Sequence, residues 1–192
     1  MRRNSLADVR LVSDRLLLRA PQPGDLVWQL EHLNTAAVMR HLGGVREPEV
    51  VAAGFDKNVA ALARGEPGFW TVVLRTGGET IGKCGLAGME SAAAPDELRD
   101  GIQIGWSLAE RFWGQGLASE AARAVMSHGF ATLALDQLWS QTSDSNAASS
   151  RMMMRLGMQR CAKLDYVDPD YPDEDNPTTV YRITRQAWAK SA

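Results

Sequence analysis

Residues 113–118 read WGQGLA and stand directly before an alanine-rich amphipathic stretch. Glycine costs backbone entropy, so two glycines around one residue need a structural reason. The N–H groups in the first turn of a helix lack partners, and the helix dipole makes that end positive. Because glycines let these groups approach an anion closely, we interpret Gly114 and Gly116 as a turn that binds a diphosphate. A tight turn without a ligand is the alternative.

Two common phosphate-binding turns do not fit this stretch. A dinucleotide fold expects Gly-x-Gly-x-x-Gly after the first strand, but Ser119 stands where the third glycine belongs, and the motif lies past mid-chain. A P-loop expects Gly-Lys-Ser or Gly-Lys-Thr, and the sequence contains neither. If the turn binds a phosphate, that phosphate belongs to another class of ligand.

Hydrophobic periodicity and turn residues predict the elements that position this turn. After Gly116, apolar residues such as Ala122 and Val125 recur at helical spacing. The predicted order is strand 15–19, a helix from a cap at Asp25 to Thr35, helix 49–64, strands 69–75 and 80–89, a loop at 90–100, strand 101–108, the helix after residue 116, strand 137–143, a helix capped by Asn146 and ended by Gly157, and strands 158–167 and 178–185. This order is typical of a mixed α/β (α+β) fold with helices packed on a sheet, in one domain over residues 1–192.

Composition excludes several classes of function. The chain has 192 residues, 45% hydrophobic and 23% charged, and a formal net charge of -2, whereas nucleic-acid binders are typically basic. We expect no membrane span and no signal peptide, because the apolar runs are too short and none follows the two N-terminal arginines. Cys84 and Cys161 are expected to be free thiols, and His32, His41 and His128 lack metal-ligand spacing. We therefore expect a cytoplasmic protein without a metal.

Several motifs, taken in order, resemble one enzyme family. SDRLLLR, VMRHLGG, GIQIGWSL, NAASSRMMMRLGM and TTVYRITRQAW follow one another at the family's spacing. The glycine turn matches the family signature in two frames, as Arg111-x-x-Gly114-x-Gly116 or as WGQGLA over 113–118, and we adopt the second. The chain thus resembles the GCN5-related N-acetyltransferase (GNAT) superfamily, in its RimJ/RimL-like branch of ribosomal-protein N-terminal acetyltransferases. The resemblance covers about residues 13–188.

The resemblance implies a GNAT fold, acetyl-CoA as co-substrate, a primary amine as acceptor, and no metal. In this fold a mixed, mostly antiparallel sheet flanked by helices splays between its fourth and fifth strands, and the pantetheine arm of coenzyme A lies in the gap. The backbone of Trp106, Ser107 and Leu108 would pair with that arm, and an N–H of this strand, assigned to Leu108, would stabilise the oxyanion. The backbone N–H groups of Gly114, Gln115, Gly116, Leu117 and Ala118 are implied to hold the pyrophosphate, and Trp113 before them is implied to bind the cofactor.

Three polar residues of the NAASSRMMMRLGM segment match further positions of the family. Asn146 corresponds to the asparagine that contacts the pantetheine arm, and simple helix capping is its alternative. Arg151 and Arg155 are placed near the 3′-phosphate, with a solvated helix face as their alternative. Ser149 remains as the candidate acid for the departing thiolate, because Met153 stands where some relatives have a tyrosine. An ordinary serine at a helix start is an equal alternative for Ser149.

The general base that many relatives use is absent from its usual positions. An ammonium cannot attack a thioester, so many relatives supply a glutamate, but here Gln103 and Gln141 stand at those places and an amide accepts no proton at neutral pH. Three explanations remain: an α-amine of pKa ~7.7–8.0 that is partly neutral without help, a carboxylate from a loop, or a non-catalytic acyl-CoA-binding or sensor module of the same fold. The first explanation favours an N-terminal or other weakly basic amine over lysine.

The segment 165–176, DYVDPDYPDEDN, is acidic and would attract a cationic acceptor. We place Asp168, Asp170 and Tyr171 in the acceptor site, with a solvated loop as the alternative. The acceptor is either a peptide N-terminus or a small-molecule amine, and no nucleic-acid or membrane partner is expected. The sequence leaves a homodimer open.

Overall fold

The computed structural model describes residue 6, residues 8–89 and residues 91–191. Within them one eight-stranded sheet has the order β1-β2-β3-β4-β5-β6-β8-β7, and neighbouring strands are antiparallel except β5 and β6. The strands are β1 (Leu11–Val12), β2 (Leu16–Arg19), β3 (Phe69–Leu74), β4 (Thr80–Gly88), β5 (Ile102–Leu108), β6 (Gln137–Ser143), β7 (Gln159–Arg160) and β8 (Thr178–Thr184). The helices are α1 (Pro23–His32), α2 (Ala36–Met39), α3 (Pro48–Ala63), α4 (Leu117–Ala131), α5 (Ala147–Arg155) and α6 (Arg185–Ser191). The expected mixed, mostly antiparallel sheet with flanking helices is confirmed. The expected loop at 90–100 begins at a residue outside the described ones.

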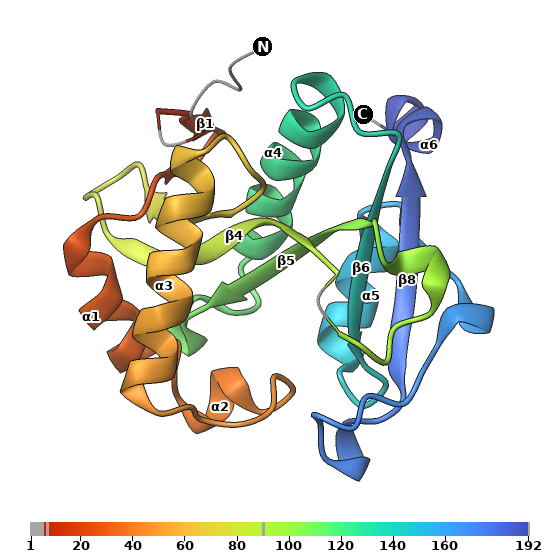
Figure 1. Cartoon of the computed structure of the whole chain (residues 1–192). Coiled ribbons are helices and arrows are strands. Elements are labelled where there is room, and N and C mark those ends of the chain that lie inside the picture. Colours follow the sequence, from red (N-terminus) through yellow and green to blue (C-terminus); the bar gives the residue numbers. More distant parts are fainter. Residues whose placement is uncertain (1–5, 7, 90, 192) are drawn as a thin grey trace.

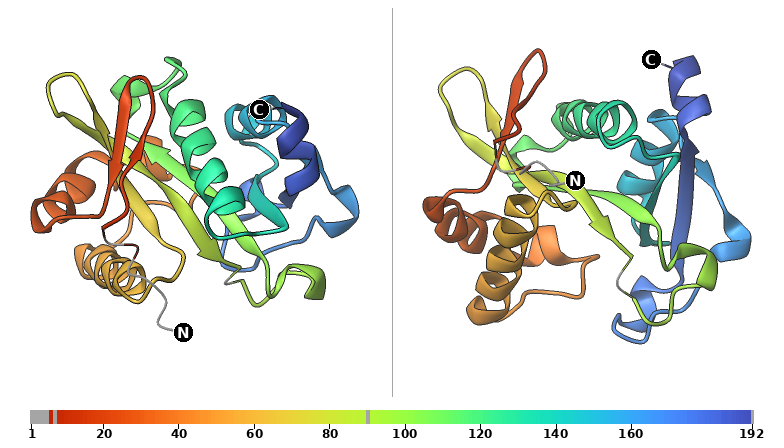
Figure 2. Two further views of the ribbon diagram at one scale, coloured as in Figure 1. Left: turned by 90° about the horizontal axis from the view of Figure 1, so that it is seen from above. Right: turned by 45° about the horizontal axis from the view of Figure 1, so that its top comes forward.

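The helices cover both faces of the sheet. In Figure 1, α1 and α3 lie on the near face, and α4 lies behind β4 and β5; Figure 2 shows the same layers from above. Ala121 and Ala122 of α4 are fully buried, and their short side chains let the helix approach the strands closely. Val125 and Met126 fill the rest of this face. The apolar spacing that predicts the helix is therefore also the surface that docks it.

The sheet opens between β5 and β6. β5 forms seven residue pairs with β4, whereas its pairing with β6 is limited to Gln103 and Trp139. At the end where β5 and β6 pair, a Cβ on Gly101 would come within 2.7 Å of Trp139 Cδ1. Only glycine therefore lets the backbone at residue 101 lie so close to the Trp139 ring. Beyond it the two strands diverge, as Figure 1 shows. The splay expected between the strands at 101–108 and 137–143 is confirmed.

The predicted strand 158–167 is wrong for most of its length. Gln159–Arg160 pair with β8, but a 3₁₀ helix follows at Ala162–Leu164, and only Tyr166 then bridges back to β8. The carboxylate of Asp165 accepts the N–H of Val180 at 3.0 Å. A side chain thus takes the place of the backbone carbonyl that a continuous strand would offer.

The first helix begins earlier than predicted, because Asp25 is not its cap. Gln22 is the N-cap, Pro23 is the first helical residue, and the Asp25 carboxylate reaches back to accept the Gln22 N–H at 2.7 Å. Arg19 holds the same carboxylate through two bonds of 2.6 and 2.9 Å, and Thr71 donates a third at 2.9 Å. Burial raises the pKa of Asp25, but these bonds outweigh it and leave the pKa below its usual value.

Two further boundaries differ from the prediction. Thr35, expected to end the first helix, instead caps the short α2 by accepting the N–H of Val38 at 3.3 Å. The last strand stops at Thr184, whose hydroxyl accepts the N–H of Ala187 at 3.2 Å, so α6 begins where a strand to residue 185 was predicted. In contrast, Asn146 and Gly157 bound α5 as expected.

His128 makes the stability of the fold depend on pH. Its ring lies in α4 edge-on to Trp70, with ring centroids 5.4 Å apart, and its Nε2 has no partner among the described residues. Burial lowers the pKa of His128, so the folded state favours the neutral ring. As the pH falls below about 6.5, the unfolded chain takes up a proton that the folded chain does not, and stability decreases.

We predict that His128→Phe loses less stability than the wild type on acidification. The phenyl ring keeps the contact with Trp70 but has no proton to bind, so the His128 contribution to the pH slope disappears. Urea unfolding at about pH 7.5 and about pH 5.5 measures the difference. An equal loss of unfolding free energy in both proteins would contradict this role of His128.

Candidate functional site

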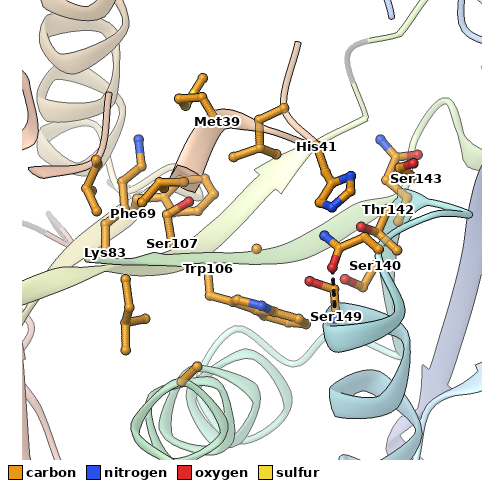
Figure 3. Close-up of a pocket in the computed structure, with 18 of the residues that line it drawn as sticks. Met39, His41, Phe69, Lys83, Trp106, Ser107, Ser140, Thr142, Ser143 and Ser149 are labelled. Carbon is orange, nitrogen blue, oxygen red and sulfur yellow. Dashed lines mark hydrogen bonds between the residues drawn. The ribbon is translucent and has the colours of Figure 1, made fainter. Parts of the chain in front are cut away.

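A cleft of about 1700 Å³ occupies the opening between β5 and β6. Its walls come from α2 and the loop after it, from α3, β3 to β6, the starts of α4 and α5, and the loop 165–176. In Figure 3 side chains of both halves of the sheet point into it, with Lys83 and Phe69 at one end and Ser140 and Thr142 at the other. Of the residues expected to bind a ligand, the cleft is lined by Trp106, Ser107, Leu108, Trp113, Gly114, Gly116, Leu117, Ala118, Asn146, Ser149, Arg151, Asp168, Asp170 and Tyr171. Gln115 does not line it.

The glycine turn needs glycine for its backbone conformation. Gly114 and Gly116 have φ angles of 73° and 75°, a left-handed region that strains other residues, and Gly116 is the N-cap of α4. Arg15 braces the turn from outside by donating to the carbonyl of Gln115 at 3.1 Å. The Gln115 side chain folds back onto the carbonyl of Arg111 at 2.9 Å, which explains why it does not line the cleft.

The space in front of this turn fits an anion. A Cβ on Gly114 would meet no protein atom within 4 Å, so the turn faces open cleft rather than packed core. Leu117 begins α4, whose first N–H groups are free of helix partners and whose dipole is positive here. Glu120 adds a negative charge to the same turn, but Arg15 pairs with it at 2.6 Å. Burial raises the pKa of Glu120, and the bonds from Arg15 and Ser13 outweigh it and keep the pKa low.

The backbone of β5 turns alternate residues toward the cleft. The carbonyl of Ile104 accepts a serine hydroxyl of β6 at 3.0 Å, and that of Leu108 accepts Nε1 of Trp113 at 2.7 Å. In an antiparallel ladder the N–H and C=O of one residue point to the same side. The polar groups of Trp106 and the N–H of Leu108 therefore face the cleft. Those of Ser107 face β4, and Ser107 reaches the cleft with its side chain (Figure 3).

The start of α5 brings three expected residues to the opposite wall. The side-chain oxygen of Asn146 accepts the N–H of Ser149 at 3.1 Å, so Asn146 caps the helix and lines the cleft at once. In Figure 3 the hydroxyl group of Ser149 points into the cleft beside the ring of Trp106. Arg151 is exposed at the rim, and Met153, at the position of the relatives' tyrosine, is buried at 1% exposure.

Neither glutamine at the expected base positions has a carboxylate as a hydrogen-bond partner. Gln103 donates from Nε2 to the carbonyl of Gly88 at 3.2 Å. Gln141 accepts the hydroxyl of Tyr166 at 2.9 Å. Burial raises the pKa of Tyr166, so this phenol stays protonated and donates. These positions supply hydrogen bonds but no proton acceptor at neutral pH.

The acidic loop contains both structural and exposed carboxylates. Asp168 is 4% exposed and accepts the N–H of Asp170 at 3.1 Å, so its charge helps to shape the loop. Asp170 is exposed at the cleft rim. Tyr171 packs toward Gly43 in the loop after α2, since a Cβ there would lie 3.8 Å from its ring. Burial raises the pKa of Tyr171; the charge of Arg46 acts against this, and those of Asp168, Asp170 and Asp175 add to it.

A cluster of three side chains in and beside the cleft was missed by the sequence analysis. Nδ1 of His41 lies 3.0 Å from Oδ1 of Asp175 and 3.1 Å from Oγ of Ser145. The hydroxyl of Ser145 also donates to Asp175 at 3.3 Å. The three residues lie 30 to 134 positions apart in the chain, so no local spacing connects them. Only the long-range folding of VMRHLGG against the acidic loop brings them together.

Lys83 was also missed, because TIGKCGL has the pattern of an ordinary strand. The lysine is half-buried on the cleft face of β4, with Nζ 5.7 Å from the centre of the Phe69 ring. Burial, and then the charge of Arg46, lowers its pKa. Within residues 8–89 and 91–191 no carboxylate lies at ion-pair distance from Lys83.

No metal centre is found in the described part of the chain, where no three His, Cys, Asp or Glu side chains are grouped to hold an ion. Over the same residues, no helix has the length and apolar character needed to cross a membrane. The free cysteines are separate: Cys84 is fully buried, where burial holds the pKa of its thiol far above the usual range, and Cys161 is partly exposed.

The splayed sheet and the glycine turn at a helix start define the class of protein. The profile of the Acetyltransferase (GNAT) domain matches residues 15–159, and the chain belongs to that family. This assignment supports an acyltransferase that transfers an acetyl group. The family uses acetyl-CoA.

Individual relatives agree with the family assignment. YkkB of Bacillus subtilis is 29% identical over 157 residues, which cover 79% of this chain and 86% of YkkB. FsC-acetyl coenzyme A-N(2)-transacetylase of Aspergillus fumigatus is 31% identical over 126 residues, 65% of this chain but only 54% of that protein. The crystal structure of an acetyltransferase from Agrobacterium tumefaciens superposes with a TM-score of 0.73 at 26% identity, over 91% of this chain and 94% of that one. RimL, a ribosomal L7/L12 alpha-N-protein acetyltransferase solved with coenzyme A, shares the fold with a TM-score of 0.71 at 19% identity, over 93% and 99%.

Proposed function

We propose that the protein is an N-acetyltransferase of the RimJ/RimL-like kind that moves the acetyl group of acetyl-CoA to an α-amine of a protein N-terminus. The observation that carries this proposal is the cleft itself, which starts at the glycine turn of α4 and continues between β5 and β6. A ligand with a pyrophosphate at one end and a long, narrow arm has this shape. A small-molecule amine is the second acceptor class.

The turn at 113–118 holds the pyrophosphate in this proposal. The positive φ angles of Gly114 and Gly116 leave the N–H groups at the start of α4 uncovered, and the helix dipole favours the negative charge. Leu117 and Ala118 line the same end of the cleft. Arg151, exposed at the rim, is assigned to the 3′-phosphate.

The pantetheine arm pairs with β5 in this proposal. The polar backbone groups of Trp106 and the N–H of Leu108 face the cleft, where β6 is too far away to bond them. Asn146 meets the arm from the other wall. The N–H of Leu108 is assigned to the thioester oxygen, because a fixed donor aimed at a developing oxyanion stabilises it.

The reaction in this proposal is a direct attack within a ternary complex. The amine nitrogen forms a bond to the acetyl carbon, the C–S bond breaks, and the thiolate receives a proton. Ser149, with its hydroxyl toward the cleft, is the assigned proton donor. At the rim of the cleft, Asp170 attracts the cationic amine and Tyr171 lines the pocket that receives it. Asp168 fixes the conformation of the loop by accepting the N–H of Asp170.

A non-catalytic acyl-CoA-binding or sensor module is the rival function. The amides Gln103 and Gln141 and the buried Met153 favour it, because they replace the acid and base groups of relatives. A protein N-terminus reduces the need for a base, since an α-amine of pKa ~7.7–8.0 is partly neutral at physiological pH.

Steady release of free thiol from acetyl-CoA distinguishes the two functions. We predict release that depends on an added amine, tested with a hexapeptide carrying a free N-terminal serine, with spermidine and with an aminoglycoside, and we predict that the peptide is the fastest. Mass spectrometry identifies the acetylated product. Tight binding of acetyl-CoA without thiol release from any of the three amines would establish the binding module instead.

Gly116→Val is predicted to weaken coenzyme A binding by about tenfold or more, equivalent to about 1.4 kcal/mol, because valine strains the left-handed φ of 75° and displaces the N–H groups of the turn. Gly77→Val is the matched control: Gly77 has φ 82° and open space around it, but lies outside the cleft. Both variants carry similar backbone strain, so calorimetric titration with coenzyme A isolates the effect on the site. Wild-type affinity in a folded Gly116→Val protein would refute the assigned turn.

Ser149→Ala is predicted to lower turnover a few-fold and to leave acetyl-CoA affinity unchanged. The effect is modest because a thiol of pKa ~8.5 departs without much assistance. Ser150→Ala is the matched control, since Ser150 is adjacent in α5 but does not line the cleft. Steady-state kinetics and calorimetry measure the two quantities. Equal losses of turnover and affinity would assign Ser149 to cofactor positioning.

A further inference from the structure

A histidine and a carboxylate meet at the acceptor end of the cleft. His41 lies in the loop after α2, and Asp175 in a 3₁₀ helix at Asp173–Asp175 before β8. The Asp175 side chain is 5% exposed and the His41 ring 22% exposed. A buried carboxylate is costly unless it is hydrogen-bonded, and Asp175 receives its bonds from His41 and Ser145. The two side chains are therefore held together by burial and hydrogen bonds, unlike an exposed surface ion pair.

The hydrogen bonds assign the protonation pattern of the imidazole. A carboxylate only accepts, so the Nδ1 of His41, 3.0 Å from Oδ1 of Asp175, carries the proton. Nε2 is then the nitrogen with a free lone pair, and it has no hydrogen-bond partner among the described residues. In Figure 3 the ring of His41 projects into the cleft, between Met39 on one side and Ser140 and Ser149 on the other. A base is thus aimed at the place where the proposed acceptor enters.

We propose that His41 is the general base of the reaction and that Asp175 positions it, an inference that rests on the proposed acetyltransferase function. The acceptor enters as an ammonium and gives one proton to Nε2 of His41. The neutral amine attacks the acetyl carbon, and a C–N bond forms while the C–S bond breaks. Ser149 gives its hydroxyl proton to the departing sulfur, which leaves as a thiol, and takes up the second amine proton in return. His41 finally returns its proton to water, so charges and atoms balance.

The other polar groups that line the cleft are less suited to that role. Gln103 and Gln141 are amides and Arg46 is a guanidinium, so none of them accepts a proton at neutral pH. Lys83, whose pKa burial lowers, lies at the opposite end of the cleft from Ser140 and Thr142 in Figure 3. The phenols of Tyr166 and Tyr171 stay protonated, because burial raises the pKa of each. The other charged groups that line the cleft are the guanidinium groups of Arg40, Arg151 and Arg155, which accept no proton, and three carboxylates. Asp168 and Asp175 already accept bonds within the fold, and Asp170 is exposed at the rim.

The test compares His41→Gln with the wild type, using whichever of the three amines the wild type acetylates fastest. We expect turnover near neutral pH to fall about 100-fold, while the affinity for acetyl-CoA stays unchanged. The loss should shrink as the pH approaches the pKa of the amine itself, because a neutral amine no longer needs a base. His32→Gln is the matched control, since His32 does not line the cleft, and it should keep the wild-type profile.

Two further variants keep the proposal falsifiable if His41→Gln folds poorly. His41→Ala should regain turnover when imidazole is added to the buffer, which a purely structural histidine would not show. Asp175→Asn should reduce turnover less than His41→Gln, with the same pH-dependent recovery, because it loses orientation rather than the base. Wild-type turnover in His41→Gln, a loss that is independent of pH, or no rescue by imidazole would overturn the role of His41. No thiol release by the wild type with any of the amines would instead overturn the proposed function.

Discussion

The divergence of β5 from β6 is the constraint on which the rest of the site depends. Each strand residue carries a backbone donor and acceptor that must find a partner. β5 bonds to β4 along its whole length, but to β6 only at Gln103 and Trp139. Some backbone groups of β5 that have no partner in β6 bond to side chains, as the carbonyl of Leu108 does to Trp113 Nε1. The others face the cleft. A strand that is half-satisfied in this way is a preformed partner for an extended ligand.

The two ends of the cleft have opposite electrostatic character. At the start of α4 the glycine turn offers N–H groups and a positive dipole, and Arg15 neutralises the acidic Glu120 in the same turn. At the end proposed for the acceptor, the loop 165–176 contributes Asp170 and Asp175, and Asp175 pairs with His41 of the loop after α2. In the proposed reaction, an anionic cofactor and a cationic amine would be drawn to different ends. The reactive groups would then meet in the middle of the cleft, beside Trp106.

Local features of the fold were predictable because their causes are local. Gly116 and Gly157 end up where their left-handed conformations are required, and Asn146 caps the helix that begins next to it. The secondary-structure prediction was wrong where a side chain, rather than the backbone of a neighbouring strand, supplied the hydrogen-bond partner. Asp165 takes a ladder bond from Val180 and breaks the predicted strand 158–167, although nothing in the spacing of that segment reveals it.

The sequence by itself determined the family, most of the helices and strands, and the glycine turn before α4, because periodicity, glycine conformation and helix capping act over a few residues. Only the tertiary structure decided which polar groups share the cleft. His41, Ser145 and Asp175 come from three separate segments, and Lys83 becomes half-buried only when β4 lies inside the sheet. Contacts of this kind depend on long-range packing and burial. The order of residues in the sequence does not reveal which distant segments pack together or which side chains they bury.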